Sequence, residues 1–212
     1  MRMGNIIDFE AIRKEKEEQL LTLTLEHASQ LQNYINKNVN IREMVKAKHI
    51  FNAKVERNRS VPFSSLEDLL FQDWLKHDYL TIRGTTIYQE FILQFSKANG
   101  IHPLQQVLHA LFMASVLEPF KVIKFEEHHI YAEKILTGEQ AFIYVTSPLE
   151  ITTNKIVFFR SIPIFTQLLC ISDLFAVDEE KMNKFFLDFH KSQDSWRTFL
   201  KKNAIKYVWS CP

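Results

Sequence analysis

The chain has 212 residues, 46% of them hydrophobic, which suits one large domain or two small ones and excludes a disordered chain. Its 26 Lys and Arg against 25 Asp and Glu leave a net charge of +1, so no overall field indicates a nucleic-acid or membrane partner. Two cysteines are too few for a disulfide scaffold or a four-thiolate zinc site, and four glycines nearly exclude a glycine-rich phosphate loop.

The apolar stretches of the sequence are short. None approaches the roughly 20 residues that span a bilayer, and residues 1–10 lack the apolar segment of a signal peptide. We therefore expect a cytoplasmic protein without a membrane partner. Since no nucleophile-elbow, Walker or dinucleotide fingerprint is present, we also expect no cofactor.

The first part of the chain predicts two helices. In residues 9–36 apolar side chains recur at helical spacing: Leu21, Leu25, Ala28, Leu31 and Ile35. The charged beginning of this segment is either a solvated helix start or a mobile docking arm. A second helix is expected from about Ile41 to Arg57.

Capping signals delimit the following helices. Ser64 with Glu67 three residues later predicts a capping box. Residues 99–100 supply a C-terminal stop for the next helix. Pro103 suits the first position of another helix, which we expect to end before Pro119.

From Phe120 the hydrophobic period changes from helical to two, the repeat of a strand. Residues 137–140 read as a hairpin turn, and Pro163 favours a strand end, an edge or a bulge. Together the strand candidates indicate a small antiparallel β-barrel or curled sheet over about residues 120–175, or alternatively a flat meander covered by a helix. The five candidates are residues 120–127, 131–136, 141–145, 156–164 and 168–171.

The C-terminal part is again helical. Asp178 is a candidate N-cap for a helix that could continue through Leu200. The expected fold class is thus α+β, with a mainly helical region at residues 1–118, a small β unit at 119–177, and a C-terminal helix and tail at 178–212.

The middle of the chain resembles a group of uncharacterised bacterial proteins. The matching motifs are Phe71-Gln72-Asp73-Trp74-Leu75, Asp78-Tyr79, Gly84-Thr85-Thr86, Ile135-Leu136-Thr137-Gly138-Glu139 and Arg160-Ser161-Ile162-Pro163-Ile164. The resemblance covers residues 66–165. It implies a tryptophan-containing helical segment before a β unit with a Leu-Thr-Gly-Glu turn, and a bacterial or phage origin, but no activity. Some members carry a cysteine-rich zinc-binding tail, whereas this chain has one cysteine near its end.

The densest cluster of titratable groups is Glu126, Glu127, His128 and His129. Two imidazoles and two carboxylates suit a divalent metal or proton transfer. On a strand, however, neighbouring side chains point to opposite faces, so the two histidines would not share one metal. A solvated strand end or hairpin turn is the competing interpretation, and it is favoured.

The main local charge asymmetry lies in residues 42–59. Its six basic side chains could contact phosphates, the main source of non-specific nucleic-acid affinity, although a solvated helix face is the favoured interpretation. Lys201, Lys202 and Lys206 would extend this patch if the C-terminus folds nearby. The six are Arg42, Lys46, Lys48, Lys54, Arg57 and Arg59.

The remaining reactive side chains have structural interpretations. Cys170 lies in an apolar run, the setting of a buried and inert thiol. His102 precedes Pro103, at a helix cap, and His109 is expected to be a partnered structural histidine.

These observations lead to three hypotheses about function. The first is a non-enzymatic accessory or regulatory protein that binds a protein partner, or nucleic acid through the basic helix; its contacts would lie on the N-terminal arm, on residues 42–59 or on the exposed rim of the β unit. The second is a metal-assisted hydrolase that uses Glu126 to His129. The third is a structural subunit of an assembly. The sequence does not determine the oligomeric state.

Overall fold

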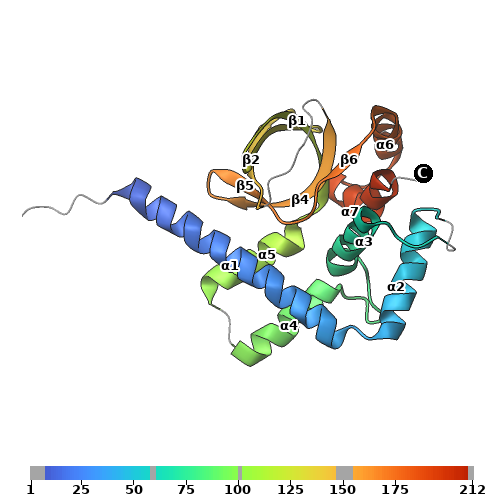
Figure 1. Cartoon of the computed structure of the whole chain (residues 1–212), viewed down its shortest axis with the longest axis horizontal. Coiled ribbons are helices and arrows are strands. Elements are labelled where there is room, and N and C mark those ends of the chain that lie inside the picture. Colours follow the sequence, from blue (N-terminus) through green and yellow to red (C-terminus); the bar gives the residue numbers. More distant parts are fainter. Residues whose placement is uncertain (1–7, 58–60, 100–101, 147–154, 210–212) are drawn as a thin grey trace, which may run out of the picture.

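The computed structural model of the protein describes residues 8–57, 61–99, 102–146 and 155–209 (Figure 1). Within these residues, helices form the first half, strands follow, and two helices end the chain. In order they are α1 (Phe9–Asn38), α2 (Ile41–Lys54), α3 (Ser65–His77), α4 (Ile87–Asn99), α5 (Pro103–Ala114), β1 (Leu117–Glu126), β2 (His129–Lys134), β3 (Gln140–Tyr144), β4 (Ile156–Ile164), β5 (Gln167–Cys170), β6 (Phe175–Val177), α6 (Glu179–Lys191) and α7 (Trp196–Val208). The predicted α+β class is confirmed.

Side chains cap the helices where the sequence predicts it. Ser64 and Glu67 form the reciprocal capping box that starts α3. His102 caps α5 in the same way with Gln105, and Pro103 is the first residue of that helix. The predicted C-terminal helix is instead two helices. The chain leaves helical geometry at Ser192, and a second cap forms at Ser195.

Five of the strands close into a barrel. The sheet order is β1-β2-β3-β5-β4, and β1 also pairs with β4. All of these pairs are antiparallel except β3 with β5, which is parallel. The expectation of a wholly antiparallel barrel is therefore wrong at that one pair. β4 pairs antiparallel with β1 and β5 pairs antiparallel with β4, which gives β5 the same direction as β3.

Two boundaries differ from the expectation. β1 begins at Leu117, and Pro119 lies inside it, opposite Phe158 of β4. The expected boundary between residues 118 and 119 thus falls within a strand. The short β6 was not expected, because three residues are too few to show a period; it pairs with the beginning of β4. Pro163 lies near the end of β4, as predicted.

Tight turns join three pairs of consecutive strands, and each of these turns contains a residue with positive φ. Gly138, at φ 70°, lies in the predicted turn between β2 and β3. Glu127, at φ 50°, lies between β1 and β2. Phe165, at φ 47°, lies between β4 and β5, where a bulky side chain in left-handed backbone is strained.

Two hydrophobic clusters hold the molecule together. The smaller one fills the barrel and includes Phe120 and Phe159, whose rings stack at 4.3 Å between centroids. Cys170 belongs to it, and burial raises the pKa of this thiol to about 12, which agrees with an inert cysteine. The larger cluster combines side chains of all seven helices with the outer face of the barrel, so the three expected regions share one core.

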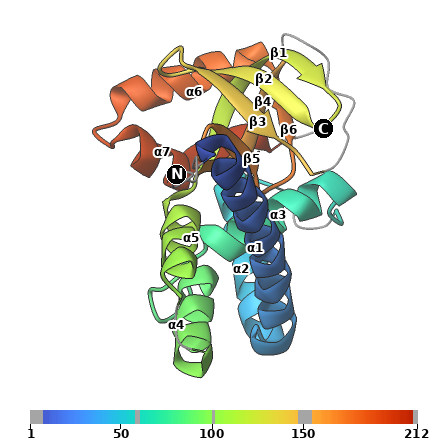
Figure 2. The same ribbon diagram turned by 90° about the vertical axis from the view of Figure 1, so that its left-hand side faces the viewer.

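The helices cover part of the barrel wall. Figure 2 shows the barrel at one end of the molecule, with α1, α2, α4 and α5 extending away from it and α6 and α7 beside it. The N-terminal part of α1 passes the barrel and projects beyond the helical layer (Figure 1). Of the helices that the structure describes, none is both long enough and apolar enough to span a bilayer.

An ionic cluster joins the helical layer to the barrel. Arg160 of β4 is fully buried and donates to the carboxylates of Asp73 and Asp78, at 2.9 and 2.8 Å from its Nη2. A second nitrogen donates to the carbonyl of Ser115, at the end of α5, at 2.9 Å. One side chain from the barrel therefore holds the C-terminal parts of two different helices, α3 and α5.

Candidate functional site

Four aromatic side chains line the outer face of β2 and β3, and we call them the aromatic strip: His129, Tyr131, Phe142 and Tyr144. Residues two apart on a strand share a face, which places His129 beside Tyr131 and Phe142 beside Tyr144. The register aligns Tyr131 with Phe142 and His129 with Tyr144 across the strands. The alternating neighbours, such as Ile130 and Ile143, fill the barrel.

The rings of the aromatic strip contact one another continuously. His129 stacks on Phe142 with 4.6 Å between centroids and an angle of 4° between planes. Tyr131 lies 4.9 Å from Phe142, and His129 lies 5.4 Å from Tyr144. Tyr131 is 40% exposed and the other three side chains are partly exposed. A ladder of partly solvated rings is similar to the aromatic surfaces that occur at protein interfaces.

The charges around the aromatic strip are mixed, with an acidic excess. Lys124 lies beside Tyr131, 6.0 Å from its ring centre, and forms an ion pair with Glu126. Glu127 follows in the exposed turn. Basic side chains therefore do not dominate this face, as they would on a phosphate-binding surface.

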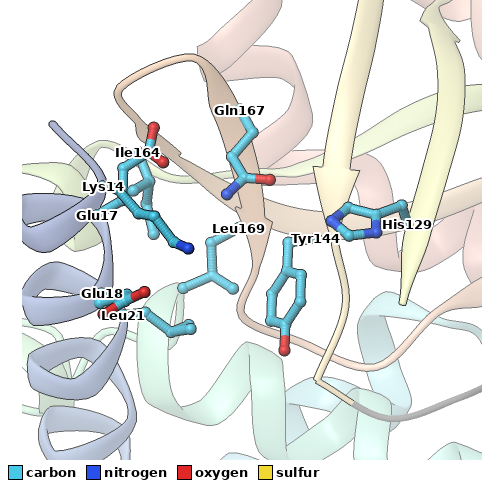
Figure 3. A pocket seen from close by; sticks show the side chains of 9 residues that line it. All are labelled: Lys14, Glu17, Glu18, Leu21, His129, Tyr144, Ile164, Gln167 and Leu169. Carbon is cyan, nitrogen blue, oxygen red and sulfur yellow. The ribbon is translucent and has the colours of Figure 1, made fainter. Parts of the chain in front are cut away.

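The aromatic strip leads into a pocket of about 220 Å³ between α1 and the barrel (Figure 3). Figure 3 shows the charged side chains of α1 along one wall, with Leu169 and Tyr144 across from them. Thr166 donates to Glu17 at 3.2 Å, which ties the β4–β5 turn to α1. The lining residues are Lys14, Glu17, Glu18, Leu21, His129, Tyr144, Ile164, Gln167 and Leu169.

Two polar groups of this pocket lack intramolecular partners. The carboxamide oxygen of Gln167 is buried without a hydrogen bond, counting the residues that the structure describes. Over the same residues, no ion pair or side-chain hydrogen bond engages the carboxylate of Glu18. Buried acceptors normally have a donor, so the oxygen of Gln167 is an unsatisfied group in the wall of this pocket.

The cluster that suggested a metal site is a turn. Glu126 ends β1, His129 begins β2, and the two face each other across the strands. His128 lies 3.1 Å from the carbonyl of Val145 through its Nδ1, and His129 belongs to the aromatic strip. In the described parts of the chain, no group of three or more His, Cys, Asp or Glu could hold a metal ion. The described residues therefore provide no set of metal ligands that would support the hydrolase hypothesis.

Two basic side chains of the 42–59 segment, Lys48 in α2 and Arg57 after it, are engaged within the molecule. Arg57 packs on the rings of Phe63 and Trp209, at 4.7 and 5.5 Å, and donates to the carbonyl of Pro62 at 2.7 Å. Lys48 lies over Phe63 and Phe71, at 5.3 and 5.6 Å from their ring centres.

The other basic residues of the 42–59 segment differ in how far they are engaged within the molecule. Lys46 pairs with Glu43 at 3.9 Å, whereas Arg42 is exposed. Lys54 donates to the carbonyl of Lys202 at 3.5 Å, so α7 does lie beside this helix, and Lys206 pairs with Glu56. Arg59 is outside the described residues.

A second pocket, of about 160 Å³, lies where α1 turns into α2. Its polar groups satisfy one another. Glu90 accepts hydrogen bonds from Thr81 and Thr85, both at 2.9 Å, and the hydroxyl of Tyr79 donates to Glu43. This pocket stabilises a loop, and among the residues that the structure describes none of the buried side-chain polar atoms that line it lacks a hydrogen-bond partner.

Three buried histidines lie among the helices. His27 contacts the hydroxyl of Tyr88 at 2.7 Å, and its ring centre lies 4.9 Å from that of His109. Burial, with His109 second, lowers the pKa of His27 to about 4. Burial, with Arg160 second, lowers the pKa of His77 to about 3. These histidines are neutral at physiological pH and belong to the core. Among them the sequence singled out only His109, as a structural residue.

The sequence interpretation indicated this candidate surface only coarsely. It named the exposed rim of the β unit, but from the strip it singled out only His129, and that as a metal ligand. Aromatic residues two apart, at 129 and 131 and again at 142 and 144, were the available signal. The pocket had no local signal, since its walls lie more than a hundred residues apart in the chain. Comparison of the chain with protein-family models, with curated proteins and with solved structures found no match.

Proposed function

We propose that this protein is a binding protein that receives an extended segment of a protein partner on the aromatic strip. The observation that carries the proposal is the continuous contact of four partly exposed rings on adjacent strands. Exposed aromatic side chains supply much of the binding energy at protein interfaces, because they bury a large area at a small entropic cost.

The connectivity of the barrel supports this location. A five-stranded barrel in which β1 pairs with β2 and β4, and β3 runs parallel to β5, is similar in strand order to oligonucleotide- and oligosaccharide-binding barrels. In such barrels the face of strands 2 and 3 receives the ligand. That analogy concerns place only, since the same fold serves many functions.

Local charge favours a protein over a nucleic acid. Around the aromatic strip and the pocket, Lys14 and Lys124 are outnumbered by four carboxylates: Glu17, Glu18, Glu126 and Glu127. Phosphate backbones require an excess of basic groups. The basic helix remains the alternative for nucleic acid, with Arg42 and Lys46 as its accessible positions, because Arg57 and Lys48 are packed on aromatic rings.

A site-specific cross-link tests the proposal. The photoreactive residue benzoyl-phenylalanine replaces Tyr131 in one full-length version and Leu93, an exposed residue of α4, in the matched control. On illumination in the native cells, we expect position 131 to yield a discrete protein adduct that survives nuclease, and position 93 not to yield it. Adding Phe142→Ser should reduce the adduct without lowering the melting temperature appreciably.

Three results would oppose the proposal. Identical adducts from positions 131 and 93 would indicate collision rather than a site. Absence of any adduct at position 131 would remove the aromatic strip as a binding surface. An adduct that nuclease destroys would show that the aromatic strip binds nucleic acid instead of a protein.

A further inference from the structure

We infer that the pocket at the end of the aromatic strip accepts an arginine side chain of the partner segment. This inference rests on the proposed function and adds the chemistry that would orient the segment. Two members of the aromatic strip, His129 and Tyr144, also line the pocket, so a chain lying along the strip reaches it without a gap.

The pocket presents acceptors of three kinds. The carboxylate of Glu18 on α1 and the ring of Tyr144 on β3 lie on opposite sides of the pocket, and the carboxamide of Gln167 on β5 lies between them, with its oxygen on the side of Tyr144 (Figure 3). A guanidinium matches this set better than an ammonium does. It is planar, carries five N–H donors, stacks on aromatic faces and is weakly hydrated.

The apolar lining suits the rest of the side chain. Leu21, Ile164 and Leu169 contribute the hydrocarbon surface of the pocket, against which the three methylenes of an arginine can pack. The volume of about 220 Å³ is sufficient for one such side chain but not for a folded element.

Lys14 is the competing cation in the pocket. It also lines the wall on α1, yet over the described residues it forms no ion pair with Glu17 or Glu18. Because a lysine has a long flexible chain and a strongly hydrated head, Lys14 can move its charge into water when a guanidinium enters. Its removal should therefore strengthen binding of a cation, whereas removal of the charge of Glu18 should weaken it.

The experiment titrates the full-length protein with N-acetyl-arginine methylamide and follows the methyl NMR signals of Leu21 and Leu169. The matched probe is N-acetyl-citrulline methylamide, which has nearly the same shape without the charge. We expect saturable shifts with the arginine compound and at least about fivefold weaker binding of the citrulline compound, an effect of about 1 kcal/mol.

Three variants test which side chains of the pocket attract or repel the cation. Glu18→Gln should weaken binding of the arginine compound about two- to fivefold, as a partly exposed ion pair does. Lys14→Gln should strengthen it by a similar factor. Glu26→Gln, at an exposed position on the same helix, should leave it unchanged.

Equal binding of the two compounds, or no saturable shift of the two leucine methyl groups, would overturn the inference. So would equal effects of Glu18→Gln and Glu26→Gln. The cross-link at position 131 does not depend on arginine, so a chain that cross-links but does not distinguish arginine from citrulline retains the proposed function and loses only this inference.

Discussion

Arg160 and Asp73 are 87 residues apart in the sequence and form a buried bidentate ion pair, with Nε and Nη2 of the arginine on the two carboxylate oxygens at 2.9 to 3.3 Å. Burial alone would raise the pKa of Asp73, but Arg160 beside it holds that pKa below its ordinary value. The pair fixes the orientation of α3 on the barrel wall.

We expect Arg160→Met to lower the free energy of unfolding by about 3–5 kcal/mol, because it leaves Asp73 and Asp78 buried without their counter-ion. Urea denaturation followed by circular dichroism measures this change. Arg13→Met, which breaks an exposed pair with Glu10, is the control and should cost less than about 1 kcal/mol. Equal losses in the two variants would contradict a central role for Arg160.

Acidification should begin to destabilise the protein at pH values well above the range in which carboxylates titrate. His27 and His77 have pKa values lowered to about 4 and about 3 in the folded state, so below pH 6.5 the unfolded chain binds protons that the folded chain does not. Stability is full above that pH and is lost as the pH falls toward 4, by roughly 3 kcal/mol for each histidine.

Unfolding free energies measured by urea denaturation between pH 7 and pH 4 test this expectation. The variant His27→Gln should show a slope reduced by about one proton over that range, even if it is less stable throughout. An unchanged slope would mean that His27 does not account for the loss.

The strained turn between β4 and β5 should yield a stabilising variant. Phe165 has φ 47° and is 59% exposed, so its backbone conformation is unfavourable and its side chain contributes little to the core. Phe165→Asn should raise the free energy of unfolding by about 1 kcal/mol, since asparagine tolerates left-handed backbone. Phe165→Ala keeps the strained backbone, so its melting temperature in thermal denaturation should not rise. If it rose as much as that of Phe165→Asn, the stabilisation would come from loss of the ring.

The basic residues of the 42–59 segment include one that stabilises the fold, Arg57, and one that is exposed to solvent, Arg42. Arg57→Ala should destabilise the fold by about 2 kcal/mol, because it removes a cation packed on two aromatic rings and a hydrogen bond to the carbonyl of Pro62. Arg42→Ala should change stability by less than about 0.5 kcal/mol.

A nucleic-acid role for this helix is therefore best tested with Arg42→Glu and Lys46→Glu, which avoid the packed positions. Binding of single-stranded DNA that falls steeply with salt, and falls further in these variants, would support that role. Binding that is absent or insensitive to salt in the unchanged protein would remove it.

Local patterns predicted most of the secondary structure. The capping box at Ser64, the proline that starts α5 and the turn at Gly138 depend on residues within a few positions of one another, and each lies where the sequence indicates it. The strand period likewise identified all five strands of the barrel. It did not predict the break at Ser192, where an apolar face continues in sequence but the backbone turns.

The sequence by itself determined the elements, the α+β class and the buried state of Cys170, because periodicity and capping are local properties. Only the tertiary structure decided that β3 and β5 pair in parallel, that Arg160 meets Asp73, and that α1 and the barrel enclose a pocket. These relationships join residues far apart in the chain. They arise from the closure of the barrel and from the burial of a shared core, and neither leaves a repeating pattern in the sequence.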